Sequence, residues 1–224
     1  MFIQQENYFR IKKEADEKNA VLVAVSKTKP IEAIKELYDL GHRDFGENYV
    51  QELNEKQQQL PSDIRWHFIG HLQSNKVKSI APFVQLIHGI DSFKLLKEVN
   101  KQALKNSRII PVLLQVHIAK EETKFGLDEN ELHEILNTKL NHKLHELKNI
   151  IIRGLMGMAS FTNDENIIRE EFKTLKRLFD KYAQHRTSNI ELQILSMGMS
   201  GDYQVALVEG SNMVRIGSLI FGSR

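Results

Sequence analysis

Short apolar runs alternate with amphipathic stretches along the whole chain. The run at residues 21–25 is entirely apolar and mostly β-branched, which is typical of a strand buried on both faces of a parallel sheet. Pro30 then begins a helical pattern that stops at Gly41. The same order recurs and predicts strands at residues 21–25, 43–45, 66–69, 84–87, 109–116, 150–155, 192–195 and 213–216. Helices are predicted at residues 2–18, 31–40, 49–60, 74–81, 93–105 and 164–183, and from about residue 128.

Repeated strand-helix units favour parallel pairing with right-handed crossovers. Eight such strands predict an α/β fold, a single TIM-type (β/α)8 barrel, rather than an open sheet. The chain has 224 residues, an ordinary size for one such barrel, and no stretch rich in proline, glycine or serine interrupts it. We therefore expect one domain over residues 1–224.

The composition narrows the kinds of chemistry that the chain can perform. There is no cysteine, which excludes disulfides, thiolate nucleophiles and cysteine-bound metals. The net charge is only +2, and basic residues are interleaved with acidic ones, so we expect no nucleic-acid partner. The N-terminal residues have neither the pattern of a signal peptide nor the length of a membrane span. A cytoplasmic protein without membrane association is therefore expected.

Polar and glycine-rich clusters directly follow several predicted strands. In a TIM barrel the carboxyl ends of the strands carry the active site, while the opposite ends mainly contribute stability. The opposite ends of these strands carry ordinary charged residues, so the asymmetry predicts a functional site at the carboxyl ends. The clusters are residues 26–29, 46–48, 70–76, 196–202 and 217–218.

Lys27 stands just beyond the first predicted strand. Because side chains alternate along a strand, Val23, Val25 and Lys27 share one face, which we expect to line the barrel interior. A lysine amine at the rim could form a Schiff base, a reaction that requires the neutral amine. A free lysine has a pKa of about 10.4, so burial and neighbouring cations would have to favour the neutral form. The alternative is a solvated lysine at a strand end.

The loops after the seventh and eighth strands predict a phosphate site. Barrels of this type often bind phosphate there through backbone N–H groups and the start of a short helix. Ser200 supplies a hydroxyl, and Gly198, Gly201 and Gly217 allow close approach of the backbone, with Ser218 beside them. The alternative is a pair of ordinary glycine turns.

Arg215 lies within the eighth predicted strand, on the same face as Met213 and Gly217. A permanently charged guanidinium that points into a barrel needs a partner. A pyridine nitrogen or a phosphate would serve. The alternative is an ion pair with Glu47, Glu209 or another carboxylate.

Two further groups of residues could suggest chemistry. His67 and His71 are four residues apart, a metal-binding spacing on a helix, but they flank Gly70 at a strand end, so we do not expect a metal site. The four methionines that follow the sixth and seventh strands are expected to fill the core. They are Met156, Met158, Met197 and Met199.

These clusters resemble the pyridoxal phosphate homeostasis protein family. The resemblance covers nearly the whole chain, and its motifs are specific because they occur together, in order and at these spacings. They are VAVSKTKP (23–30), FGENYVQE (45–52), WHFIGHLQSNK (66–76), EETKFG (121–126), RGLM (153–156), LSMGMS (195–200), VRIG (214–217) and IFG (220–222).

The resemblance implies a fold-type III barrel like the N-terminal domain of alanine racemase, with pyridoxal 5′-phosphate (PLP) as its cofactor. Lys27 matches the lysine that forms the internal aldimine, and Arg215 matches the arginine that faces the pyridine nitrogen. Asn48 matches a residue that lines the cofactor pocket. The positions around the phosphate are matched by Ser200, Gly217 and Ser218.

The resemblance also implies a role in vitamin B6 and amino-acid homeostasis, as a carrier or buffer of PLP with no established enzymatic reaction. PLP-dependent apoenzymes are the expected acceptors, and a monomer is expected. An arginine makes the pyridine ring a weak electron sink. Racemisation also needs a second acid/base, which alanine racemase takes from an added domain and a dimer partner, whereas this chain is expected to end with the barrel.

Two enzymatic readings remain as alternatives. The first is a weakly active monomeric amino-acid racemase. The second is a Schiff-base aldolase without cofactor, but that reading expects the lysine on a later strand. Three stretches depart from the family pattern, and we expect all of them to lie away from Lys27 and Arg215. They are residues 88–91, 157–159 and position 201.

Overall fold

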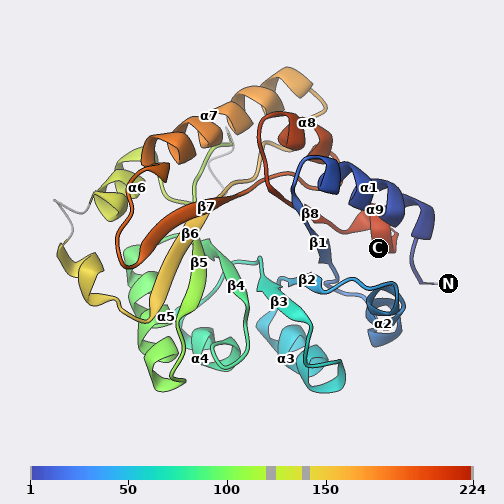
Figure 1. Cartoon of the computed structure of the whole chain (residues 1–224), viewed down its shortest axis with the longest axis horizontal. Helices are drawn as coiled ribbons and strands as arrows, with labels where there is room; N and C mark the ends of the chain where they lie inside the picture. The colour runs from blue at the N-terminus through green and yellow to red at the C-terminus, as the bar shows by residue number, and fades with distance from the viewer. Residues whose placement is uncertain (1, 120–124, 138–141, 223–224) are drawn as a thin grey trace.

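The computed structural model describes residues 2–119, 125–137 and 142–222. In this part of the chain the strands form a closed parallel barrel in chain order, with β8 pairing with β1 (Figure 1). The predicted TIM-type barrel is therefore confirmed. Its strands are β1 (Val21–Val25), β2 (Asp44–Glu47), β3 (Arg65–Phe68), β4 (Leu86–Ile90), β5 (Ile110–Gln115), β6 (Ile150–Met156), β7 (Ile190–Ser196) and β8 (Met213–Ile216).

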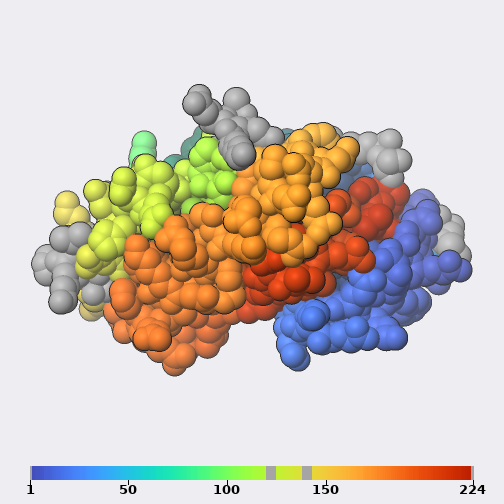
Figure 2. Space-filling view, turned by 90° about the horizontal axis from the view of Figure 1, so that it is seen from above, coloured from blue at the N-terminus to red at the C-terminus, as the bar shows by residue number. Residues whose placement is uncertain are grey.

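Helices surround the barrel, and those from the two ends of the chain lie side by side (Figure 1). The amide of Gln4 donates to the carbonyl of Ile220, 2.7 Å away. Figure 2 shows the red C-terminal segment between the blue N-terminal helix and the orange helix α7. The helices are α1 (Gln5–Glu17), α2 (Ile31–Asp39), α3 (Val50–Gln59), α4 (Val77–Ile80), α5 (Phe93–Lys105), α6 (Glu129–Leu136), α7 (Glu165–Ala183), α8 (Tyr203–Val208) and α9 (Ser218–Phe221), with 3-10 turns η1 (Ser74–Lys76) and η2 (His142–Glu146).

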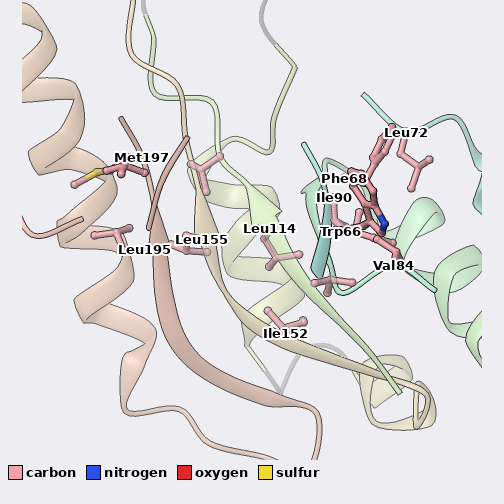
Figure 3. Close-up of a cluster of buried hydrophobic side chains, with 14 of the residues drawn as sticks. Trp66, Phe68, Leu72, Val84, Ile90, Leu114, Ile152, Leu155, Leu195 and Met197 are labelled. Atoms are coloured by element: carbon pink, nitrogen blue, oxygen red, sulfur yellow. The ribbon is translucent and has the colours of Figure 1, made fainter. Parts of the chain in front are cut away.

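Hydrophobic side chains pack on both faces of the barrel wall. A large cluster lies between strands and helices, and Figure 3 shows part of it around Trp66, Leu114 and Leu155. A smaller cluster of Val23, Leu86, Leu113, Met156 and Met213 lies in the interior. Since Val23 belongs to the interior cluster while Leu22 and Ala24 belong to the outer one, the predicted facing of the first strand is confirmed.

Several predicted boundaries are wrong. The second strand includes Gly46 and Glu47, which were expected in a loop, because both continue the register with β3. The fourth strand spans Leu86–Ile90 instead of residues 84–87, since the amide of Val84 still donates to Ile80 at the end of α4. The helix predicted at residues 74–81 is a 3-10 turn followed by one α-helical turn.

None of the helices in the described ranges combines the length and apolar character that crossing a bilayer requires. The short helices α8 and α9 were not predicted. Each follows one of the last two strands and begins at the polar loops that the sequence singled out. The fold therefore places a helix start beside each of these loops.

Candidate functional site

A cavity of about 400 Å³ opens at the carboxyl ends of β1, β2 and β8, where a barrel of this type carries its active site. The structure brings all of the predicted site residues to its wall, which are Lys27, Asn48, Ser200, Arg215, Gly217 and Ser218. Their roles stay predictions. The other lining residues are Val25, Thr28, Lys29, Ile69, Met158, Phe161, Met199, Gly201 and Gly222.

Two of the expected core methionines line this cavity instead. Met156 and Met197 are buried, as predicted, but Met158 and Met199 lie at the cavity wall, so the expectation was wrong for this pair. Both follow the carboxyl ends of β6 and β7, where a barrel of this type carries its site, but Met197 also follows β7 and is buried, so position alone did not separate them.

A tight turn after β1 carries Lys27. The amide of Ser26 donates to the carbonyl of Gly46 (3.0 Å), and the amide of Lys29 donates back to Ser26 (3.1 Å). Thr28 takes a left-handed backbone conformation, with φ of +62°. Lys27 is half-buried at the cavity wall. The backbone bonds on both sides of Lys27 therefore fix where its side chain leaves the chain.

Lys29 also reaches the cavity wall, so the choice between the two lysines matters. Its Nζ donates to the carbonyl of Gly222, 3.1 Å away. This bond ties Lys29 to the C-terminal segment at the rim. Lys27 instead continues the interior-facing alternation of Val23 and Val25. Both amines reach the cavity wall, and the choice of Lys27 as the reactive amine stays a prediction.

A buried ionic network lies beneath the turn. Glu47 Oε1 accepts from the hydroxyl of Ser26 (2.6 Å) and from Nζ of Lys56 (2.7 Å). Lys56 also donates to the carbonyl of Ser26 (2.7 Å) and to Glu52 (2.6 Å). Burial raises the pKa of Glu47, while Lys56 and Ser26 act in the opposite direction. The network anchors the Lys27 turn to helix α3.

Arg215 projects from β8 into the barrel and is only 4% exposed. Its Nη1 donates to Oγ of Ser196 (2.6 Å), and its Nη2 donates to the carbonyl of Gly157 (3.0 Å). Burial lowers the pKa of Arg215 to about 10, with the charge of Asp202 acting in the opposite direction. At neutral pH the side chain is therefore a cation that faces the cavity.

The structure decides between the alternatives for Arg215 and corrects one expectation. Among the described residues Arg215 forms no ion pair, and Glu47 and Glu209 pair with Lys56 and Arg169 instead. The stretches that depart from the family pattern were expected to lie away from Arg215. However, the carbonyl of Gly157 is one of its acceptors, since the end of β6 lies across the interior from β8.

The loops after β7 and β8 are joined at the cavity. The amide of Gly217 donates to Oγ of Ser200, 3.3 Å away. A Cβ at Gly217 would lie 3.2 Å from the carbonyl oxygen of Val25, so only glycine lets the chain pass this close without adjustment. Ser218 begins helix α9, and the first amides of a helix have no partner within it. Hydroxyls and helix-start amides therefore gather at one end of the cavity.

The wall also holds an unpaired acceptor. Oδ1 of Asn48 is buried and has no hydrogen-bond partner among the described residues. A buried acceptor of this kind is costly unless a ligand supplies a donor. The amine of Lys27, the guanidinium of Arg215 and the donors near Ser218 lie around the same cavity. This donor set fits PLP, which carries an aldehyde, a ring nitrogen and a phosphate.

The remaining titratable groups are placed away from this chemistry. Among the described residues that line the cavity there is no carboxylate, histidine or tyrosine. His67 lies in the barrel interior, whereas His71 pairs with Asp91 (3.1 Å) and stacks on Phe125. In the described ranges no three metal-ligating side chains form a group.

Fold and site together define a class: eight-stranded parallel barrels with a lysine after the first strand and an arginine on the last. The chain matches the family of the alanine racemase N-terminal domain over residues 4–224. Pyridoxal phosphate homeostasis proteins from Aquifex aeolicus and Haemophilus influenzae are 42% and 40% identical to it. The matches cover 92% and 99% of this chain and 87% and 93% of those proteins.

Solved structures give the same result. PipY from Synechococcus elongatus is 33% identical, with matches that cover 97% of this chain and 99% of PipY. The TM-score is 0.88 for PipY without PLP and 0.85 for PipY with PLP bound. Alanine racemase from Bartonella henselae, at 16% identity and a TM-score of 0.72, shares the fold over 94% of this chain and 56% of its own length.

The chain therefore belongs to the alanine racemase N-terminal domain family, and within it to the pyridoxal phosphate homeostasis proteins. The resemblance seen in the sequence is confirmed. Of its motifs, residues 121–124 lie outside the described residues.

Proposed function

We propose that this chain binds PLP covalently through Lys27 and serves as a cytoplasmic carrier or buffer of the cofactor. The observation that carries the proposal is the convergence of Lys27, Arg215 and the Ser200–Gly217 pair on one cavity. Two similarities support it. The curated relatives are named for pyridoxal phosphate homeostasis, and the related PipY has a structure with PLP bound.

Each part of the cavity has a proposed role toward PLP. Nζ of Lys27 would bond to the aldehyde carbon, forming C=N, while the aldehyde oxygen leaves as water. Arg215 would face the ring nitrogen. The hydroxyl of Ser200 and the backbone at Gly217 and Ser218 would hold the phosphate, and Asn48 would line the ring. In bound form the cofactor supplies an electron sink.

A carrier role is favoured over catalysis for two physical reasons. A cationic Arg215 is a poor acid toward the ring nitrogen and so weakens the electron sink. Proton transfer on both faces of a substrate also needs two acid/base groups. In the described part of the cavity wall, Lys29 is the one ionisable side chain besides Lys27 and Arg215, and its amine donates a hydrogen bond to the carbonyl of Gly222.

On this proposal the physiological acceptors are PLP-dependent apoenzymes, and the chain acts as a monomer in vitamin B6 and amino-acid homeostasis. An appreciable rate of α-proton exchange on any amino acid would contradict the carrier role and favour the weak racemase. Deuterium uptake by the amino acid, followed by NMR in heavy water, measures that rate directly.

Borohydride reduction of the PLP-loaded protein, followed by peptide mass mapping, tests the anchor. We expect the pyridoxyl group on Lys27. Lys27→Met should abolish the adduct, because no other amine then lies in the interior-facing alternation. Lys29→Met, the matched control at the same cavity, should keep it. An adduct on Lys29, or none in the wild type, contradicts the proposal.

A further inference from the structure

A continuous line of hydrogen bonds crosses the barrel interior from Arg215 to the opposite end. Arg215 Nη1 lies 2.6 Å from Ser196 Oγ, and Ser196 Oγ lies 3.2 Å from His88 Nδ1. His88 Nε2 lies 3.0 Å from His67 Nδ1. His67 Nε2 lies 3.1 Å from Oδ1 of Asp44. We call the chain Arg215–Ser196–His88–His67–Asp44 the interior relay.

The charge state at each position follows from burial and partners. Burial would raise the pKa of Asp44, but hydrogen bonds from Arg65 and His67 outweigh it and hold that pKa well below its usual range. Burial lowers the pKa of His88 well below its usual value, and the neighbouring His67 and Arg215 act in the same direction. At neutral pH the relay therefore ends in a carboxylate and contains a neutral imidazole.

With His67 neutral, only one arrangement of protons satisfies every bond. The carboxylate of Asp44 accepts, so Nε2 of His67 carries the proton and its Nδ1 accepts from Nε2–H of His88. Nδ1 of His88 then accepts from the hydroxyl of Ser196, whose oxygen accepts from Arg215. All four bonds donate in the same direction, and aligned hydrogen bonds strengthen one another at low dielectric.

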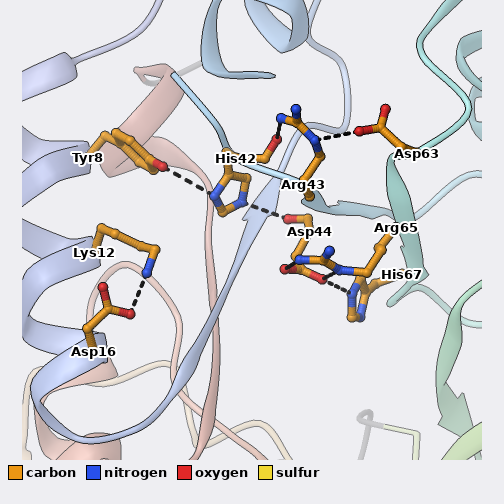
Figure 4. Close-up of polar contacts among 9 residues, drawn as sticks. All are labelled: Tyr8, Lys12, Asp16, His42, Arg43, Asp44, Asp63, Arg65 and His67. Atoms are coloured by element: carbon orange, nitrogen blue, oxygen red, sulfur yellow. Dashed lines mark hydrogen bonds and ion pairs between the residues drawn. The ribbon is translucent and has the colours of Figure 1, made fainter. Parts of the chain in front are cut away.

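The relay links two cavities at opposite ends of the barrel. Its first member, Arg215, lines the candidate cofactor cavity. Its last members, His67 and Asp44, line a second cavity of about 350 Å³ at the amino ends of the strands. Figure 4 shows this end, where Arg65 and His67 both contact Asp44. Between the two ends, Ser196 and His88 are fully buried.

We propose that the interior relay positions the Arg215 guanidinium and couples its hydrogen bonding to Asp44 at the opposite mouth of the barrel. Ser196, His88, His67 and Asp44 are thus positioning residues for the cofactor site. If these polar groups served only to fill the interior, each would need a hydrogen-bond partner and nothing more. In the interior relay all the hydrogen bonds also point in one direction and run without a break from one cavity to the other.

The effect on the cofactor rests on the proposed function, but the coupling to Arg215 does not. The test therefore begins without cofactor, with side-chain nitrogen NMR of the wild-type protein at neutral pH. We expect His67 and His88 both to carry the proton on Nε2. A proton on Nδ1 of either histidine would overturn the relay, and this measurement needs no variant that could fail to fold.

Asp44→Asn then tests the coupling over the length of the barrel. It should shift the guanidinium resonance of Arg215, and in the PLP-loaded protein it should speed PLP release about threefold or more and move the absorption band of the bound cofactor. Ser196→Ala should have a larger effect, roughly tenfold on release, and Ser196→Thr should restore the wild-type values because it keeps the hydroxyl.

Asp63→Asn is the matched control. Asp63 lies at the same end of the barrel and also pairs with an arginine, Arg43, but it is exposed and does not touch the relay (Figure 4). It should leave the Arg215 resonance, the rate of PLP release and the absorption band of the bound cofactor unchanged. An unshifted Arg215 resonance in Asp44→Asn, or an equal shift in Asp63→Asn, overturns the proposal. If the wild type takes up no PLP, the proposed function fails, while the Arg215 resonance still decides the relay.

Discussion

Gly198 controls the geometry of the loop between β7 and α8. Its φ is +96°, a conformation that side-chain-bearing residues rarely adopt. A Cβ there would lie 2.6 Å from Cβ of Ala206 in helix α8. The carbonyl of Gly198 also accepts the backbone N–H of Arg215, 3.0 Å away. One glycine therefore sets the loop conformation, the approach of α8 and the backbone position of Arg215.

We predict that Gly198→Ala destabilises the protein by about 3 kcal/mol or more, because backbone strain and overpacking add. Chemical denaturation measures the free energy of unfolding. PLP binding should weaken in the same variant, since the loop carries Ser200 and supports Arg215.

Gly201→Ala provides the comparison within the same loop. Gly201 has no positive φ, and a Cβ there would meet nothing within 4 Å. Its free energy of unfolding should stay within about 0.5 kcal/mol of the wild type. Equal losses in the two variants would mean that the loop tolerates no side chain at all, and the specific argument for Gly198 would be wrong.

At the scale of elements, helix starts are fixed by local side-chain caps. Helix α6 begins with a reciprocal pair: Oδ1 of Asp128 accepts from the amide of Glu131 (2.8 Å), and Oε2 of Glu131 accepts from the amide of Asp128 (3.0 Å). In α5 the cap is Ser92, which accepts from the amide of Leu95. The starts of both helices agree with the predicted ranges, and a side-chain cap of this kind acts through neighbouring residues alone.

We predict that Asp128→Ala lowers the free energy of unfolding by about 1 kcal/mol, since the amide of Glu131 in the first turn of α6 loses its acceptor. Thermal denaturation with matched baselines measures the change. Glu134→Ala, an exposed position in the same helix, should have an effect within about 0.5 kcal/mol. A neutral Asp128→Ala would show that tertiary packing alone positions α6.

The short elements were harder to predict. Helices α8 and α9 have six and four residues, too few for a helical period to show in the sequence. The end of β2 was missed because Glu47 is charged, yet it lies fully buried where Lys56 neutralises it. Such a position becomes compatible with a strand only when a partner from another element is present.

At the scale of the whole molecule, buried histidines make stability depend on pH. Burial lowers the pKa of His42 to about 4 from its usual 6.5. Between these values the unfolded chain binds the proton and the folded chain does not. The contribution of His42 is therefore full above pH 6.5 and is lost as the pH falls toward 4. Burial also lowers the pKa of His88, with the same sign.

We predict that the wild type loses about 3 kcal/mol through His42 alone between pH 7 and pH 4. His42→Gln should flatten the pH dependence in this window. Glu47 acts in the opposite direction, because its raised pKa makes the folded chain bind protons more readily. Subtracting the free energy of unfolding of His42→Gln from that of the wild type at each pH cancels the contribution of Glu47. If the two proteins show parallel curves of stability against pH, the assignment to His42 is wrong.

The sequence by itself determined the barrel, the order of its strands and the faces of its first strand. These follow from local periodicity, since alternation along a strand is a property of the backbone and holds wherever the strand is placed. It also indicated the loops that hold Ser200 and Gly217, because glycine and hydroxyl residues at strand ends carry their own local signal.

Only the tertiary structure decided the partners of Arg215 and the course of the interior relay. Ser196 and His88 are 108 residues apart in the chain, and closure of the barrel brings them within hydrogen-bond distance across its interior. The local periodicity of the sequence carries no information about a contact between residues so far apart in the chain. A buried polar side chain takes its role from whichever group lies opposite it, and that is fixed only when the barrel has closed.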